Sequence, residues 1–425
     1  MYTKTKLNDQ FVQYEYQNKF ILLNTYNGQW WVYNSVNDLT SCLTAILNGD
    51  LNHEAVKQLT ENNFFQELEE YSNPTLQFHV TNKCNLRCKH CYMKCETGYE
   101  NELTYTEITK LIDDFCACGG KQVVFTGGEV LLKAEFVEIL AHAKKRGLYT
   151  IAITNGTLWT DDLIDKVSKH INQIQISLDG YDEDTNAQVR GKGVFSKALE
   201  CADKLLKKGV EVIIAFTPMY DYDKEKYIEF GKILVDKYAD CKLYLDFAPW
   251  ILNGRSVSAD VRKNEKYYKD SIDVFEAIFP GYETSLFTDV FDSPVQNCGY
   301  GKVVLNSNGD FAFCSCLSEI PTIGNVREMP MQEIFELSKI VSQKTCVDNL
   351  IPCNNCDFRH ICGGSCRMVN FENSNKIADV RDFPALTKFI PCTQERFEYF
   401  LKMMIIAHGK REEKIGDNVT TTSSK

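Results

Sequence analysis

Residues 78–95 read FHVTNKCNLRCKHCYMKC, and the rest of the chain is interpreted outward from them. The stretch begins as an apolar, strand-like run and continues into three cysteines, Cys84, Cys88 and Cys91. Three residues separate the first pair and two separate the second, which suits a loop wrapped around one inorganic cluster. Three thiolates cannot complete a cluster of four irons, so one iron keeps an open position for chemistry.

A structural zinc knuckle is the alternative interpretation of this loop. Such a site needs a fourth Cys or His at short spacing. His90 lies inside the loop and Cys95 follows it closely, so both keep that alternative open.

The loop resembles that of the radical S-adenosylmethionine (SAM) enzymes, in which the open iron chelates the amino and carboxylate groups of SAM. The aromatic residue that follows the third cysteine in that family matches Tyr92. The resemblance implies a [4Fe–4S] cluster on Cys84, Cys88 and Cys91, SAM as cofactor, and an electron donor such as flavodoxin or ferredoxin.

Length and composition fit a globular protein of two or three domains. The chain has 425 residues and a net charge of -11, which argues against the basic face that nucleic-acid binding needs. No apolar run reaches the length of a membrane span, and the N-terminus lacks the apolar stretch of a signal peptide. Eighteen cysteines without an export signal indicate metal ligands or redox groups in a reducing compartment. We therefore expect a cytoplasmic protein with no nucleic-acid or membrane partner.

Residues 1–74 are expected to form a separate small unit. Extended strands come first, with Asn27-Gly28 as a type I′ hairpin signal, and helical patterns follow near Val36–Leu47 and His53–Phe64. This order resembles the winged-helix domains of ribosomal-peptide maturases, which take the leader of a precursor peptide as an added strand. A plain extension packed on the barrel is the alternative.

Two adjacent tryptophans in this unit, Trp30 and Trp31, also have two interpretations. They can anchor a partner, or they can form the core of a small domain.

From residue 75 the pattern changes to strand-like runs that alternate with amphipathic helices. The expected strands are Leu76–Thr81, Gln122–Thr126, Tyr149–Thr154, Gln173–Leu178, Glu211–Phe216 and Lys242–Phe247. Six strand–helix units predict an α/β fold with a parallel sheet, which the resemblance identifies as a partial (β/α)6 barrel over residues 75–285. Sites in such folds gather at the C-terminal ends of the strands.

The second expected strand ends in Gly127, Gly128 and Glu129. Two glycines let a backbone approach a ligand closely, and a carboxylate can receive an ammonium group. The segment resembles the family's GGE motif, which binds the amino group of SAM. The family usually continues with Pro, where this chain has Val130.

Three further residues follow the next strands in the family's order. Asn155 lies in a TNG segment, Ser177 begins the segment SLDG, and Arg190 comes shortly after it. The resemblance implies that Ser177 contacts the SAM ribose and Arg190 the SAM carboxylate. Each also has an ordinary interpretation as a turn or a solvated side chain. The sequence identifies no catalytic acid or base.

A second group of cysteines begins at residue 298. It resembles the seven-cysteine SPASM domain, which holds two auxiliary [4Fe–4S] clusters, and implies such a domain over residues 286–408. The seven matching positions are Cys298, Cys314, Cys353, Cys356, Cys362, Cys366 and Cys392. A zinc ribbon on four of them is the alternative.

The resemblance divides these ligands between two clusters. The outer cluster would take Cys353, Cys356, Cys362 and Cys392, and the inner cluster Cys298, Cys314 and Cys366. The fourth inner ligand stays open between Cys316, Cys346 and an iron that binds a substrate thiolate. Most of the remaining thiols are expected to be buried free cysteines. A helix over Arg396–His408 and a disordered tail over residues 409–425 are expected at the end of the chain.

The implied function is maturation of a ribosomally made peptide by a 5′-deoxyadenosyl radical, with a thioether between a Cys sulfur and a carbon as product. Carbon–carbon cross-linking, epimerisation and formylglycine formation in a sulfatase are alternatives with the same machinery. A non-catalytic zinc scaffold is the alternative from another class.

Overall fold

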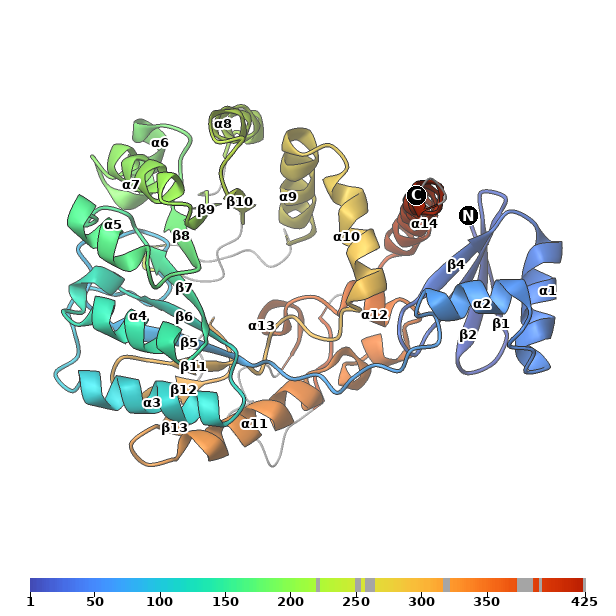
Figure 1. Cartoon of the computed structure of the whole chain (residues 1–425), viewed down its shortest axis with the longest axis horizontal. Coiled ribbons are helices and arrows are strands. Elements are labelled where there is room, and N and C mark those ends of the chain that lie inside the picture. Colours follow the sequence, from blue (N-terminus) through green and yellow to red (C-terminus); the bar gives the residue numbers. More distant parts are fainter. Residues whose placement is uncertain are drawn as a thin grey trace.

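The structure is a computed structural model that describes residues 1–218, 222–248, 254–256, 264–315, 322–372, 385–389 and 392–422. Cys316 lies outside the described residues. The chain forms a half-open barrel, a small N-terminal unit and a cysteine-rich region between them (Figure 1).

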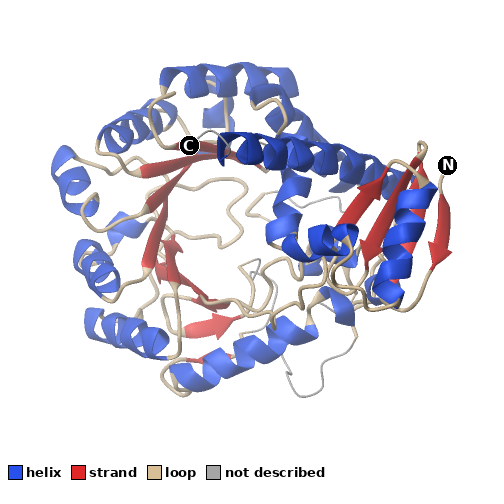
Figure 2. Ribbon diagram, turned by 45° about the vertical axis from the view of Figure 1, so that its right-hand side comes forward, coloured by secondary structure: helices blue, strands red, loops and turns tan. Residues whose placement is uncertain are grey.

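Six parallel strands build the barrel wall. They are β5 Thr75–Thr81, β6 Gln122–Gly127, β7 Tyr149–Thr154, β8 Gln173–Ser177, β9 Glu211–Phe216 and β10 Leu243–Phe247. The helices between and after them are α3 Tyr105–Ala117, α4 Phe136–Lys145, α5 Asp161–Val167, α6 Glu183–Arg190, α7 Phe195–Lys207, α8 Lys224–Lys237 and α9 Asn264–Ile278, with the short η1 Val130–Leu132. The helices cover the outer face of the curved sheet (Figure 2). The prediction of six parallel strands in a partial barrel is confirmed.

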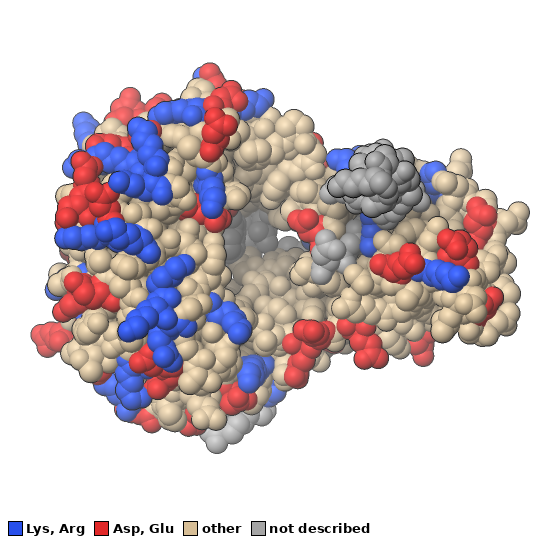
Figure 3. Space-filling view, viewed as in Figure 1, with Lys and Arg blue, Asp and Glu red and all other residues tan. Residues whose placement is uncertain are grey.

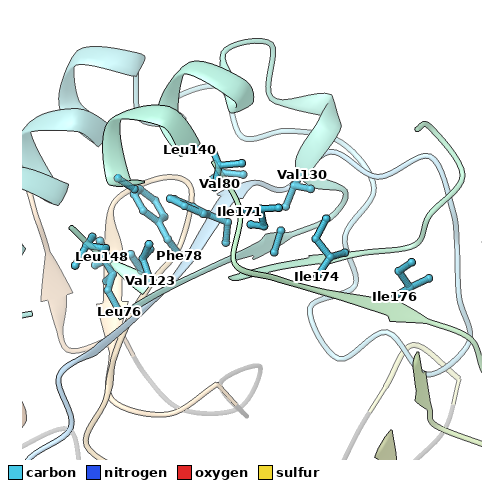
Figure 4. Close-up of a cluster of buried hydrophobic side chains, with 14 of the residues drawn as sticks. Leu76, Phe78, Val80, Val123, Val130, Leu140, Leu148, Ile171, Ile174 and Ile176 are labelled. Carbon is cyan, nitrogen blue, oxygen red and sulfur yellow. The ribbon is translucent and has the colours of Figure 1, made fainter. Parts of the chain in front are cut away.

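Along each barrel strand, side chains point alternately to the helix-covered core and to the inside of the barrel. On β5, Leu76, Phe78 and Val80 are fully buried and pack toward the helices (Figure 4). The residues between them, Gln77 and His79, therefore point to the opposite face, which is the inside of the barrel. One strand thus supplies both the core and the polar wall of the interior.

The barrel sheet does not end with these six strands. It continues beyond β5 with β11 Val303–Leu305, β12 Asp310–Ala312 and β13 Gly324–Asn325, in the order β10-β9-β8-β7-β6-β5-β11-β12-β13. The strand β11 pairs in parallel with β5, with Val304 opposite Gln77. A cysteine-rich segment is therefore built into the same sheet as the barrel, so the boundary expected near residue 285 divides one continuous sheet.

The N-terminal unit is an antiparallel sheet followed by two helices. Its elements are β1 Thr3–Lys6, β2 Phe11–Tyr16, β3 Lys19–Asn24, β4 Trp30–Tyr33, α1 Val36–Leu47 and α2 Glu54–Glu61. The sheet order is β1-β2-β3-β4. Trp30 is fully buried and donates from Nε1 to the Met404 carbonyl at 3.1 Å, and Trp31 is 8% exposed. Both tryptophans therefore serve the core, which excludes an exposed aromatic anchor.

The type I′ turn lies at a different place from the one predicted. The strands β2 and β3 are joined by Gln17 and Asn18, which both have positive φ, as a type I′ turn requires. Asn27 and Gly28 lie instead in the longer connection from β3 to β4. A Cβ on Gly28 would lie 2.7 Å from Cβ of His360, so this glycine allows close packing against the cysteine-rich region.

The C-terminal helices join the N-terminal unit to the rest. They are α10 Tyr282–Asp292, α11 Met331–Lys344, α12 Arg359–Cys362, α13 Arg367–Asn370 and α14 Gln394–Thr422, with the short η4 Val347–Asn349 and η5 Cys353–Asn355. One face of the N-terminal sheet packs with α10, α12 and α14 in a shared apolar cluster. None of the helices in the described part of the chain is long and apolar enough to cross a bilayer.

The last helix extends further than the sequence predicted. A helix ending at His408 and a disordered tail were expected, whereas α14 continues to Thr422. The run KREEK at residues 410–414 consists of strong helix formers, and Gly409 costs about 1 kcal/mol relative to alanine. The local propensity therefore favours continuation of the helix.

Candidate active site

The three cysteines of the first loop line one cavity at the C-terminal end of the barrel strands. This cavity has a volume of about 560 Å³, within the range of small-molecule sites. Its lining includes Cys84, Cys88, Cys91 and Tyr92. The Leu86 N–H donates to Sγ of Cys84 at 3.4 Å, so the loop already directs a donor at one of the sulfurs.

Two glycines hold the cysteine loop against the end of β6. The Gly128 N–H donates to the Thr81 carbonyl at 2.9 Å. A Cβ on Gly128 would lie 2.0 Å from the Lys83 carbonyl oxygen, and one on Gly127, at φ +136, would lie 2.3 Å from the Thr81 carbonyl oxygen. Both positions exclude a side chain, so the glycines line the cavity as bare backbone.

Glu129 does not face the cavity. Its side chain is fully buried, and its two carboxylate oxygens accept hydrogen bonds from Thr154 Oγ1 at 2.6 Å and from the Asn155 N–H at 2.8 Å. Burial raises the pKa of Glu129. In this structure the carboxylate ties the end of β6 to the end of β7. Its contact with the ammonium group of SAM stays a prediction.

Asn155 connects the same strand end to the cysteine loop. It lines the cavity, and its Nδ2 donates to Asn85 Oδ1 at 2.9 Å. Asn85 follows Cys84 directly in sequence. The amide of Asn155 therefore helps to fix the orientation of the loop.

Asp179 is the centre of a buried charged network behind the cysteine loop. Its carboxylate lies 2.5 Å from Arg190 Nε and 2.5 Å from His90 Nε2, and it accepts a hydrogen bond from the Thr217 N–H at 3.2 Å. Burial opposes ionisation of Asp179, but Arg190 and His90 keep its pKa below the usual range. The guanidinium NH1 of Arg190 lies 3.8 Å from Sγ of Cys88. The network therefore holds one cation beside a loop sulfur.

Residues 78–231 match the model of the Radical SAM superfamily, and this region contains the cysteine loop and the strand ends around the cavity. Over these residues the chain belongs to the Radical SAM superfamily.

Its curated relatives differ in what they make. The Fe-coproporphyrin III synthase of Methanosarcina barkeri is 35% identical over 147 residues, which cover 34% of this chain and 37% of that protein. The AdoMet-dependent heme synthase of Oleidesulfovibrio alaskensis is 26% identical, over 70% of this chain and 84% of that one. The sporulation killing factor maturation protein SkfB of Bacillus subtilis is 26% identical, over 65% and 68%.

Solved structures confirm the fold. SuiB of Streptococcus suis bound to S-adenosylmethionine superposes with a TM-score of 0.51 and 17% identity, covering 85% of this chain and 96% of that chain. The protein anSMEcpe with bound AdoMet gives a TM-score of 0.57 and 20% identity, over 79% and 95%. SuiB has also been solved with the precursor peptide SuiA, at a TM-score of 0.52 and 17% identity, over 91% and 99%.

The residues of the cavity fit the cofactors of this superfamily, a [4Fe–4S] cluster and SAM. Three thiols line the cavity, two glycines expose bare backbone to it, and Arg190 supplies a cation beside Cys88. Ser177 lines the same cavity. Among the described residues, no three His, Cys, Asp or Glu side chains converge closely enough for a single metal ion.

Cys95 is a fourth thiol beside this loop. It lines the same cavity and is 2% exposed. Its thiol donates to Cys91 and lowers the pKa of Cys91. Cys95 therefore supports a loop thiolate by a hydrogen bond, which sequence spacing alone did not indicate.

The four cysteines expected to hold the outer auxiliary cluster line a second cavity of about 350 Å³. They are Cys353, Cys356, Cys362 and Cys392. Lys388 Nζ donates to Sγ of Cys392 at 3.1 Å, and Arg396 NH2 donates to Sγ of Cys362 at 3.3 Å. These four thiols and two cations fit an anionic iron–sulfur cluster.

The inner set gathers around Cys366. Its thiol donates to Cys298 and, opposed by burial, lowers the pKa of Cys298. The charge of Cys314 also acts on Cys366. Cys346 faces a separate cavity, where its Sγ lies 4.0 Å from Gln296 Oε1 and 3.8 Å from Asp348 Oδ2. Nothing in these contacts favours Cys346 as the fourth inner ligand.

Sequence analysis missed two groups of polar residues at the site. Asp179 was included only as a letter of the segment SLDG, although its place at a strand end was a usable signal. Gln77, Gln175 and Lys302 also line the cavity, and the period-two alternation of β5 and β8 could have placed the two glutamines inside the barrel.

Proposed function

We propose that this radical SAM enzyme matures a ribosomally made precursor peptide by joining a Cys sulfur to a carbon atom. One observation carries the proposal: the cavity lined by the first cysteine loop is also lined by Ser315, which adjoins Cys314 of the inner set. A substrate in this cavity would contact both the SAM site and the segment that holds the inner cysteines. Such an arrangement suits a reaction in which a radical forms on a carbon atom of the substrate and a sulfur atom then bonds to that carbon.

We also propose which residues hold the iron–sulfur cluster and SAM. Cys84, Cys88 and Cys91 would hold the [4Fe–4S] cluster that binds SAM. SAM would contact the backbone of Gly127 and Gly128 and the side chains of Tyr92, Asn155, Ser177 and Arg190. When bound and reduced, this pair supplies a 5′-deoxyadenosyl radical, which removes a hydrogen atom from an unactivated carbon.

The chain's own residues position the reactants. Asp179 fixes the side chain of Arg190, which would bind the SAM carboxylate as a preorganised cation. The hydrogen bonds of Glu129 to the end of β7 fix Asn155 and, through Asn85, the cysteine loop. Figure 3 shows a deep hollow between the barrel and the N-terminal unit, with few charged side chains on the walls visible in this view.

The auxiliary sets would complete the electron balance. The substrate loses two hydrogen atoms as the carbon–sulfur bond forms, one to the deoxyadenosyl group and one as a proton and an electron. The cysteine-rich region would take this electron through an inner cluster on Cys298, Cys314 and Cys366. Cys353, Cys356, Cys362 and Cys392 would hold an outer cluster, and the two clusters would supply electron transfer and, at an open inner position, a site for the substrate thiolate. The electron that starts the reaction would come from a donor such as flavodoxin or ferredoxin.

The N-terminal unit would bind the leader of the precursor peptide as an added strand. The outer edge of β1 is the available one, because β1 ends the sheet order and its four residues are exposed. The opposite edge strand, β4, packs against α14 through Trp30 and Trp31. Hydrogen exchange of the anaerobic enzyme tests this role: the leader should protect the β1 amides. Unchanged exchange throughout the N-terminal unit would contradict it.

The relatives point to two classes of substrate, peptides and porphyrins, so both must be tested. SkfB is named as a maturation protein and SuiB was solved with a precursor peptide, which supports a peptide substrate. The heme synthases among the relatives make a porphyrin substrate the control.

The test is anaerobic turnover with a short cysteine-rich peptide, taken from a neighbouring gene where one encodes it, followed by mass spectrometry and thiol alkylation. We expect a loss of two hydrogens and one fewer alkylated cysteine per cross-link. A loss of two hydrogens with every thiol still reactive would indicate carbon–carbon cross-linking, and an unchanged mass with an inverted residue would indicate epimerisation. Conversion of Fe-coproporphyrin III instead of the peptide would overturn the proposal.

A further inference from the structure

The cavity of the active site contains a lysine that the reaction as proposed does not use. Lys302 lines the cavity and directly precedes β11. Since β11 pairs in parallel with β5, Lys302 lies beside the N-terminal end of β5, below Gln77 and far from the strand ends that carry the cysteine loop. The backbone of Lys302 therefore lies at the end of β5 opposite the cysteine loop, and its charge acts on His79 inside the barrel.

Among the described residues that line the cavity, Lys302 has no acidic side chain to pair with. None of the described residues that line the cavity is Asp or Glu, although the chain has 58 acidic residues. The other cation of the lining, Arg190, is paired with Asp179. No carboxylate of the described residues lies within ion-pair distance of Lys302, whose positive charge is thus left for a ligand.

The groups around Lys302 are polar and neutral. Gln77 is 6% exposed, and its Nε2 lies 3.4 Å from Nε2 of His79. Burial, helped by the charge of Lys302, lowers the pKa of His79 to about 4. This histidine therefore adds no second charge at neutral pH. The amide groups of Gln77 and Gln175 can donate hydrogen bonds to an oxygen held by Lys302.

The inner cysteines already have another cation. Arg367 is fully buried, acts on Cys298, and donates to the carbonyls of Thr345 and Gly363. The positive charge that lowers the pKa of Cys298 comes from Arg367. Cys298 therefore does not need Lys302 as its cation.

We propose that Lys302, with Gln77 and Gln175, binds a carboxylate of the substrate and so selects for an acidic group next to the reacting residue. This inference rests on the proposed function for its peptide substrate. A carboxylate suits the site because one ammonium and two amides match a single negative charge with two acceptor oxygens. The carboxylate belongs either to an Asp or Glu side chain or to the C-terminus of the peptide, and two probes separate these sources.

The experiment measures binding without turnover. The reconstituted, SAM-loaded enzyme is titrated under nitrogen with three small probes: N-acetylaspartate N-methylamide, N-acetylasparagine N-methylamide and N-acetylalanine. Saturation-transfer NMR gives the dissociation constants. The aspartate and asparagine probes differ only in the side-chain carboxylate, so their ratio reports the charge contact.

Three variants assign this contact. We expect a carboxylate probe to bind about tenfold more tightly than the asparagine probe, the size of one hydrogen-bonded charge contact. The preference should persist in Lys302→Arg and in Lys232→Met, which removes an exposed lysine on α8, and should disappear in Lys302→Met. Tighter binding of the aspartate probe assigns a side chain, and tighter binding of N-acetylalanine assigns a C-terminus.

Two results would overturn the inference. One is equal binding of all three probes by the wild type, and the other is a preference for carboxylate that survives in Lys302→Met with unchanged iron content and SAM affinity. Because no probe is converted, failure of thioether formation in the peptide assay would leave this result standing. Failure of the probes would likewise leave the peptide assay standing.

Discussion

Two cavities of this molecule are lined by cysteines, and they differ in what else surrounds the sulfurs. The barrel cavity has three predicted ligands together with bare glycine backbone, hydroxyls and amides. The outer cavity has four, with Lys388 and Arg396 donating directly to sulfur and with Tyr14, Phe397 and Phe400 in its walls. With a cluster bound, the first arrangement would leave room for an exchangeable ligand, whereas the second would supply a ligand to every iron and suit electron transfer.

The largest effect is expected when the cysteines of the barrel cavity are replaced and those of the outer cavity are kept. Replacement of Cys84, Cys88 and Cys91 together by Ala should abolish formation of 5′-deoxyadenosine and remove about four of about twelve irons per chain. The outer cavity should keep its iron, because none of its ligands changes. Iron and sulfide analysis with chromatography of the nucleoside products checks both. Continued SAM cleavage by this variant would break the comparison.

The next effect concerns the charged network behind the barrel cavity. Asp179→Asn leaves Arg190 buried without its carboxylate, which typically costs about 3–5 kcal/mol of stability. SAM binding should weaken with it, because the arginine loses its orientation, while the iron of the outer cavity stays constant. Denaturant unfolding and equilibrium dialysis with labelled SAM measure the two changes.

A matched control lies on the same helix as Arg190. Asp184→Asn changes an exposed carboxylate in the first turn of α6 and should leave both quantities unchanged. Equal behaviour of the two variants would show that Asp179 has no special role.

A smaller effect is expected at Glu129. The variant Glu129→Gln retains one acceptor oxygen where two are used, by Thr154 and Asn155, so the protein should lose about 1–3 kcal/mol. Thermal unfolding measures this loss. If the variant unfolds at the same temperature as the wild type but no longer binds SAM, the result would support the direct contact between Glu129 and SAM that the sequence predicts.

The smallest effect is expected at the outer cavity, on the reduction potential of its cluster. Lys388→Met removes a donor to Sγ of Cys392 and should lower the reduction potential of the outer cluster by tens of millivolts, on the order of 1 kcal/mol. Lys388→Arg, which keeps a donor, should shift it less. Redox titration followed by electron paramagnetic resonance (EPR) measures the shift, and equal potentials in all three proteins would show that Lys388 does not act on the cluster.

The fold was largely predictable because its signals are local. Each barrel strand lies within a residue or two of its expected bounds, since apolar runs followed by glycines and polar residues mark strand ends directly. The hairpin was misplaced because Gln17 and Asn18 form a turn that their residue types signal only weakly, while Gly28 is required by its packing against His360.

The site was predictable only in part, because several contacts cross between strands. The spacing of Cys84, Cys88 and Cys91 is local, and the structure brings them to one cavity. The direction of the Glu129 side chain depends on the neighbouring end of β7, and the pairing of Asp179 with Arg190 depends on how α6 returns to the sheet. Such contacts have no signature in the spacing of a single segment.

The central claim is that the barrel cavity holds a cluster with one position open to SAM. EPR spectroscopy of the reduced, anaerobically reconstituted enzyme, recorded with and without SAM, tests it most directly. The account predicts that SAM changes the signal of one cluster in the wild type and has no effect when Cys84, Cys88 and Cys91 are replaced. Identical spectra of the wild-type enzyme with and without SAM would contradict it.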